Sequence, residues 1–181
     1  MVSIDAMGCQ KKIAITIVKQ GGDYLLAVKG NQEILHCAVQ QALASITAAK
    51  TDPEQVQIET GHGRYEAREY HVLPADTLAE QFPEWTGLKS IGVAIGYRFE
   101  KESKKQSMEY RYYISSADLD NSRFAAAVRG HWGIENSLHW VLDATMKEDA
   151  CPIYRDDAPE ILATMRHFAL NMLRAETTKK A

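Results

Sequence analysis

The chain has 181 residues, of which 45% are apolar and 25% charged, as in a globular protein of one domain or of one domain with a large insertion. The net charge of −3 argues against a strong nonspecific nucleic-acid binder, and three distant cysteines without a CxxC pair argue against a disulfide framework or structural zinc. No apolar run approaches the roughly 20 residues of a membrane span and no signal peptide pattern is visible, so we expect a cytoplasmic protein without a membrane partner.

Residues 1–50 alternate between strand and helix patterns. A short apolar strand ends at Asp5, and the helical pattern that follows stops at Gly21. A continuous apolar run over 24–30 suits a buried parallel strand, and Asn31 is placed to cap a helix that continues to about Ala48. This order predicts a βαβ unit with a parallel strand pair.

The middle of the chain, from about Glu54 to Ser116, alternates apolar and polar residues. One hairpin is expected around the Gly-His-Gly turn at 61–63, and a second around the charged loop at 101–106. The segment 81–87 between them suits a short helix or loop. The sequence therefore predicts an antiparallel sheet of about four strands.

The last third is helical. Three residues could cap its first, long helix: Asp120, Asn121 and Ser122. Gly130 and Gly133 each cost about 1 kcal/mol inside a helix, so we expect close packing or the close approach of a ligand to compensate. After a loop, Pro159 suits the first turn of a final helix through about Ala175.

The long helix carries a carboxylate on its apolar face. At about 100° per residue, Glu135 points into the middle of an apolar stripe. The stripe consists of Phe124, Val128, Leu138 and Leu142, with Trp132 at its margin. A carboxylate there costs several kcal/mol unless it has a partner or a metal. Two interpretations remain open for Glu135: a metal ligand, or a buried ion pair with His131 or His139.

Asp5 is the second candidate acid. It follows the first strand, and in open α/β sheets ligands bind outside the carboxyl ends of the strands. It could ligate a metal or cap the following helix. If Glu135 approaches Asp5 across the core, the two carboxylates suit Mg²⁺ or Mn²⁺, which prefer oxygen ligands.

Other chemistries find less support. His131, Glu135 and His139 are spaced four apart, but the outer two lie about 12 Å apart along a helix and the H-E-x-x-H motif is absent, so a zinc hydrolase is a distant alternative. No nucleophile elbow, P-loop or dinucleotide fingerprint is present. Arg64 and Arg68 follow the Gly-His-Gly turn and could contact phosphate or be a solvated hairpin tip. The tryptophans Trp85, Trp132 and Trp140 are expected in the core.

Four segments, in order over nearly the whole chain, resemble the DDE transposases of bacterial insertion sequences, in the branch that includes the H-repeat-associated proteins. The segments are SIDAMGCQKKIA, GGDYLLAVKGNQ, GHGRYEAR and HWGIENSLHWVLDATMKEDA. The resemblance implies a ribonuclease-H-like fold in which three acids bind two Mg²⁺ ions. One ion activates the nucleophile and the other stabilises the leaving oxygen during DNA strand cleavage and transfer.

Carried onto this chain, the resemblance makes Asp5 the second acid and Glu135 the third, both catalytic and metal-binding. It implies that residues 1–50 and 118–181 form a ribonuclease-H-like remnant of class α/β around an antiparallel β insertion at 51–117. Candidate contacts to insertion-sequence DNA are Arg64, Arg68, Arg129 and His131. His139 and Asn136 would support the metal ligands.

The family's first acid belongs to a strand that should precede Asp5, and no other aspartate here occupies a matching strand. We therefore expect a C-terminal portion of a transposase that is inactive alone, with weak occupancy by Mg²⁺ or Mn²⁺. The shortened sheet should expose a strand edge that could pair with a second copy. Two rivals are a non-catalytic regulator that binds DNA or transposase, and a relic without a present function.

Overall fold

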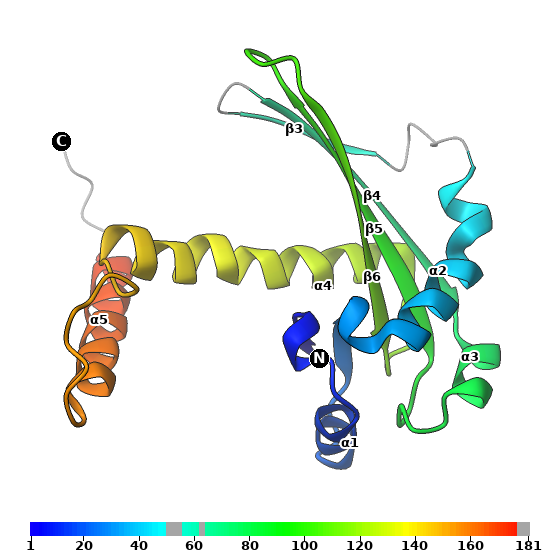
Figure 1. Cartoon of the computed structure of the whole chain (residues 1–181), viewed down its shortest axis with the longest axis horizontal. Helices are drawn as coiled ribbons and strands as arrows, with labels where there is room; N and C mark the ends of the chain where they lie inside the picture. The colour runs from blue at the N-terminus through cyan, green and yellow to red at the C-terminus, as the bar shows by residue number, and fades with distance from the viewer. Residues whose placement is uncertain (50–55, 62–63, 177–181) are drawn as a thin grey trace. The chain divides into compact units, whose positions relative to one another are not determined.

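The computed structural model describes residues 1–49, 56–61 and 64–176 (Figure 1). The chain divides into two compact units, Met1–Arg129 and Gly130–Ala181. The boundary falls inside one helix and coincides with neither of the expected boundaries at residues 50 and 117. The expected division into a ribonuclease-H-like remnant at 1–50 and 118–181 and a β insertion at 51–117 stays a prediction.

The first unit begins with the predicted strand and helix alternation. Its elements are β1 (Val2–Ile4), the 3₁₀ turn η1 (Ala6–Gly8), α1 (Lys11–Lys19), β2 (Tyr24–Val28), the 3₁₀ turn η2 (Gly30–Gln32) and α2 (Glu33–Thr47). β1 and β2 are parallel neighbours, with Ile4 opposite Leu26. The predicted βαβ unit is therefore confirmed.

The middle segment forms the two predicted hairpins. Its elements are β3 (Gln57–Gly61), β4 (Arg64–Pro74), the short helix α3 (Asp76–Gln81), β5 (Ser90–Glu100) and β6 (Gln106–Ser115). β3 pairs antiparallel with β4, and β5 pairs antiparallel with both β4 and β6. The Gly-His-Gly turn itself, with His62, lies outside the described residues.

The hairpins and the parallel pair share one sheet. Among the described residues its order is β1-β2-β6-β5-β4-β3, with β2 antiparallel to β6 and Leu26 opposite Ile114. β2 pairs with β1 on one edge and with β6 on the other, and it is buried along its whole length. The fold is therefore mixed α/β, with parallel and antiparallel strands in one sheet. The strands of the expected insertion continue the sheet that β1 and β2 begin, and β4 to β6 are long and curved (Figure 1).

Helices pack on both faces of this sheet. On one face, α2 buries Leu35, Val39 and Leu43, which share a helix side at four-residue spacing, within one core cluster that includes Val93 and Ile114. On the other face, the ring of Phe124 lies over Gly92 and makes edge contacts with Tyr70 and Tyr113. Since side chains alternate along a strand, Gly92 and Val93 face opposite helices.

Phe124 belongs to α4 (Asn121–Ile134), which is capped by Asp120. The Asp120 carboxylate accepts the Arg123 backbone N–H at 2.7 Å, and this bond lowers the pKa of Asp120. Asn121 instead accepts the Val72 backbone N–H at 3.0 Å and ties the helix to β4. A Cβ at Gly130 or Gly133 would meet nothing within 4 Å among the described residues, so close packing does not explain these glycines.

The second unit contains the end of α4, two π-helical stretches, η4 (Glu135–His139) and η5 (Val141–Thr145), and α5 (Ala158–Ala175). Pro159 lies in the first turn of α5, as predicted. Leu142 and Leu170 are buried, whereas α5 exposes several large apolar side chains: Ile161, Met165, Phe168, Met172 and Leu173. No helix within the described ranges is long and apolar enough to cross a membrane.

Candidate functional site

Asp5 directly follows β1, at the carboxyl end of the parallel pair. It begins η1 with extended backbone angles (φ −70°, ψ 171°) and makes no side-chain capping bond, so the capping interpretation of this acid is wrong. Its side chain is 52% exposed, and one carboxylate oxygen lies 3.8 Å from the Lys29 Nζ. Asp5 is therefore an accessible carboxylate at the strand ends, where a cation already faces it.

The turn that follows Asp5 is held from the start of α2. The Asn31 side chain donates to the Ala6 carbonyl at 2.6 Å, and the Gln32 side chain donates to the Cys9 carbonyl at 3.0 Å. Asn31 was expected to cap α2, and this is wrong, because its amide bonds to the neighbouring loop while α2 begins at Glu33 without a side-chain cap. These two hydrogen bonds connect the segment that follows β1 to the segment that follows β2, along one rim of the sheet.

Glu135 begins η4, where the helix changes from α to π geometry. The helical wheel assumed about 100° per residue, and a π turn contains more residues than an α turn, so the wheel fails beyond Ile134. π turns often occur at functional sites. The side chains of Glu135 and Asn136 lie outside the described part of the structure. Since Asp5 and Glu135 belong to different units, their pairing stays a prediction.

The two histidines of the predicted array lie on either side of Glu135. His131 is half-buried in α4, with its ring 5.5 Å from that of Trp132, and His139 is exposed at the end of η4. Within the described ranges, no group of three His, Cys, Asp or Glu side chains could hold a metal ion. Asp5 by itself fits a divalent ion as one oxygen ligand, and the described side chains do not complete a site around it.

The arginines predicted to contact DNA are brought together by an acid. Arg68 donates to Glu59 at 2.8 Å and to Glu66 at 2.6 Å, and Arg129 of α4 donates to the other Glu59 oxygen at 2.8 Å. Arg98 of β5 lies 3.2 Å from Glu66. The Arg68 guanidinium, and then Arg129, lower the pKa of the Glu59 carboxyl. The structure does not describe the side chain of Arg64.

Sequence reasoning missed Lys29 and Glu59. Lys29 could have been found, because it follows the second parallel strand as Asp5 follows the first. Glu59 had no signal, since its partners come from β4 and α4. Trp85 is buried as expected, but Trp140 is 62% exposed, so its expected core position is wrong.

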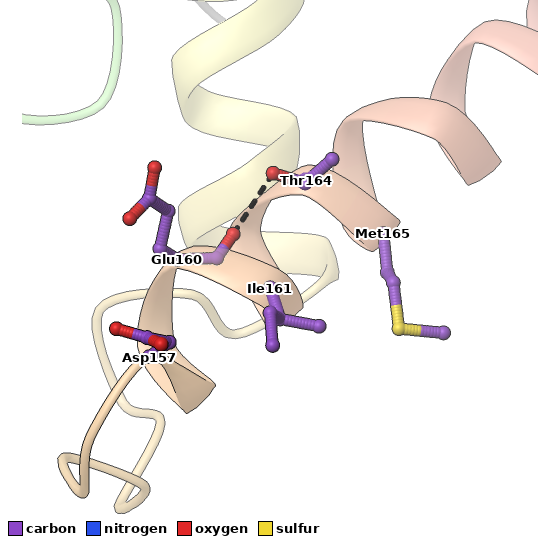
Figure 2. Close-up of a pocket in the computed structure, with 5 residues that line it drawn as sticks. All are labelled: Asp157, Glu160, Ile161, Thr164 and Met165. Atoms are coloured by element: carbon purple, nitrogen blue, oxygen red, sulfur yellow. Dashed lines mark hydrogen bonds between the residues drawn. The ribbon is translucent and has the colours of Figure 1, made fainter.

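A shallow pocket at the start of α5 holds none of the predicted site residues. Figure 2 shows its lining: Asp157, Glu160, Ile161, Thr164 and Met165. The Thr164 hydroxyl donates to the Glu160 backbone carbonyl at 2.9 Å, within the helix. All five residues belong to α5 or its cap, so no groups from separate elements converge there as a catalytic site requires.

Comparisons with known proteins show the family of the chain. The family described as "Transposase DDE domain" matches residues 1–172. The "H repeat-associated putative transposase YhhI" of Escherichia coli (strain K12) is 44% identical over 186 residues, which cover 100% of this chain and 49% of that protein. The "Putative transposase YncI" of Escherichia coli O157:H7 is 47% identical over 178 residues, 96% of this chain and 45% of that protein.

The chain spans about half the length of these curated relatives. No solved structure gives a significant match. The resemblance noted in the four sequence segments is confirmed by a match over nearly all of the chain. The chain therefore belongs to the transposase DDE domain family.

Proposed function

We propose that this chain is the part of a DDE transposase that carries the second and third acids of a two-metal DNA cleavage and strand-transfer site. The observation that supports this most is the place of Asp5, an exposed carboxylate directly after a parallel strand in a chain of this family. We also propose that β1, β2 and the flanking helices correspond to a ribonuclease-H-like core.

In this proposal, Mg²⁺ or Mn²⁺ supplies an activated nucleophile and stabilises the leaving oxygen when bound. Asp5 and Glu135 each offer an oxygen ligand, and His139 and Asn136 lie within one helical turn of Glu135 to support it. Arg64, Arg68, Arg129 and His131 would contact phosphates of insertion-sequence DNA. Arg68 and Arg129 would have to break their hydrogen bonds with Glu59 before they bind phosphate, and this would lower their contribution to DNA affinity.

These 181 residues supply two of the three acids that the resemblance implies, so we expect them to cleave DNA poorly on their own. The test is a nicking assay on supercoiled DNA with Mn²⁺, together with Mn²⁺ titration of the chain. Asp5→Asn and Glu135→Gln should each weaken Mn²⁺ binding, whereas Asp76→Asn in α3 should not. Robust nicking that Glu135→Gln abolishes would contradict the inactive state but support Glu135 as a catalytic acid. Equal Mn²⁺ affinity in all variants would overturn the proposal.

Association with a second copy is a separate proposal. In the described sheet, β1 is an edge strand that pairs with β2 on one side, so its outer edge offers unpaired backbone groups. We expect a dimer that pairs through this edge. Replacing Ser3 with Pro would remove a backbone donor there, and sedimentation should then show a monomer. A monomeric wild-type chain at high concentration would refute the dimer.

A further inference from the structure

We propose that Lys29 is a positioning residue with two alternating partners. In the ion-free chain its ammonium group balances the Asp5 carboxylate; when a divalent ion takes that carboxylate, Lys29 turns to a phosphate oxygen of bound DNA. This inference rests on the proposed function, because it takes Asp5 as an ion ligand. The experiment below separates its failure from that of the proposed function.

Backbone geometry places the two side chains together. β1 and β2 are parallel and in register, with Ile4 opposite Leu26. Asp5 comes directly after β1, and Lys29 comes directly after β2. The ends of neighbouring parallel strands lie at the same sheet edge, so both side chains belong to the edge where α/β sheets bind ligands.

The surrounding segments are held tightly, so the pair is not an accident of loop position. Asn31 and Gln32, just after Lys29, bond the turn that follows Asp5. Gly8 closes that turn by donating its backbone N–H to the Asp5 carbonyl at 2.9 Å. A Cβ at Gly8 would lie 2.3 Å from the Ile4 Cγ2, so the turn packs directly against β1.

The ion pair itself is suited to exchange. The Nζ–Oδ1 distance is 3.8 Å, and the two side chains are 56% and 52% exposed. Exposed pairs of this kind contribute little to stability, so a divalent ion can displace the ammonium group at small cost. Lys29 keeps access to solvent after displacement, and its long flexible stem can reach a phosphate at the same rim.

Glu109 of β6 is a second acid on which the charge of Lys29 acts. Both of its carboxylate oxygens accept hydrogen bonds from Arg111, at 2.8 Å each. The pKa of Glu109 is lowered first by the Arg111 hydrogen bond and less strongly by the charge of Lys29. Because both carboxylate oxygens of Glu109 already accept hydrogen bonds from Arg111, we expect Lys29, once displaced from Asp5, to bind a DNA phosphate and not Glu109.

The experiment uses the full chain with Lys29→Met, which keeps the apolar stem without the charge, and Lys29→Arg, which keeps the charge. Lys19→Met, at the far end of α1, is the matched control. Mn²⁺ affinity is measured by water proton relaxation. Lys29→Met should tighten Mn²⁺ binding by up to about fivefold, because the competing cation is gone. Lys29→Arg and Lys19→Met should stay near the wild-type affinity.

The second measurement is the salt dependence of binding to a DNA duplex of arbitrary sequence, with Mn²⁺ and with EDTA. With Mn²⁺, the slope of log affinity against log salt should become shallower by about 0.9 in Lys29→Met, the value for one lost phosphate contact. With EDTA it should not change, since Lys29 then faces Asp5. Lys29→Arg should keep the wild-type slope in both conditions.

The outcomes separate the two proposals. If Asp5→Asn weakens Mn²⁺ binding but Lys29→Met changes neither Mn²⁺ affinity nor the slope, the role of Lys29 is wrong and the proposed function stands. If the slope changes equally with and without Mn²⁺, Lys29 is an ordinary DNA contact and the exchange is wrong. If wild type and Asp5→Asn bind Mn²⁺ equally, the proposed function fails and this inference fails with it.

Discussion

The two halves of the long strands β4, β5 and β6 are stabilised by different physical effects. The near half comprises residues 69–74, 90–95 and 110–115, and the far half comprises 64–68, 96–100 and 106–109. In the near half, Val93 is buried on one face and Gly92 lies under Phe124 on the other. In the far half, Tyr65 and Met108 are exposed on one face, and arginines and glutamates pair on the other.

Substitutions in the two halves should therefore change the stability of the fold by different amounts. Burial of apolar surface is strong and nearly indifferent to salt, whereas exposed ion pairs are weak and screened. α4 belongs to both regimes, since Phe124 packs on the near half and Arg129 pairs with Glu59 beside the far half. Four predictions test this division, in order of decreasing size.

The largest effect is expected for Phe124→Ala, which should lower the free energy of unfolding by about 3–5 kcal/mol. Phe124 is 1% exposed and contacts both Tyr70 and Tyr113, so its removal leaves a cavity between α4 and the sheet. The comparison variant is Phe99→Ala, at a partly buried position of the far half. Its loss of unfolding free energy should be less than half of the loss in Phe124→Ala. Urea unfolding measures both, and equal losses would break the division.

A matched pair of glycines on one strand and one face gives a sharper test. A Cβ at Gly92 would lie 2.6 Å from the Phe124 Cζ, so Gly92→Ala should cost about 1–3 kcal/mol. A Cβ at Gly96 would meet nothing within 4 Å, so Gly96→Ala should be neutral or slightly stabilising. Thermal unfolding of the two variants should therefore shift in different directions or by clearly different amounts. If Gly92→Ala and Gly96→Ala lose the same stability, the loss comes from the backbone conformation of the strand and not from contact with Phe124.

Glu59→Gln should change stability by no more than about 1 kcal/mol, because the carboxylate is 46% exposed. It should nevertheless strengthen DNA binding at low salt, since Arg68 and Arg129 lose a shared anionic partner. Glu80→Gln, an exposed position in α3, controls for the change in net charge. Gel shifts at two salt concentrations measure the change in DNA affinity. If Glu59→Gln and Glu80→Gln strengthen DNA binding equally, Arg68 and Arg129 are not DNA contacts.

The smallest effect is a pH dependence. The pKa of Glu59 is lowered from 4.5 in the folded chain, mainly by its hydrogen bond with Arg68. Its contribution to stability is therefore present above pH 4.5 and disappears as the pH falls through the lowered pKa. The difference in unfolding midpoint between wild type and Glu59→Gln should be constant from pH 7 to about 4.5 and vanish below it. A difference that grows in acid would mean that the network destabilises the far half.

Much of the architecture could be predicted from local patterns. The apolar run over 24–30, the two alternating hairpins and Pro159 each correspond to an observed element. Asp5 could also be predicted as a site candidate, because a strand that ends in an acid is a local feature. The role of Asn31 could not be predicted, because its side-chain amide bonds to Ala6, which lies 25 residues away in the sequence. The exposed position of Trp140 could not be predicted either, because tryptophan side chains are usually buried.

The elements, their order and the family could all be read from the amino-acid sequence, because periodicity, turn residues and motifs act over a few residues. The folded chain was needed to show that β2 pairs with β6, that Glu59 joins Arg68 and Arg129, and that Lys29 faces Asp5. It was also needed to show that α4 changes to π geometry at Glu135, where a fixed angle per residue no longer holds. The strand pairing and the ion pairs depend on contacts between distant segments, and such contacts form only when the sheet and its helices pack together.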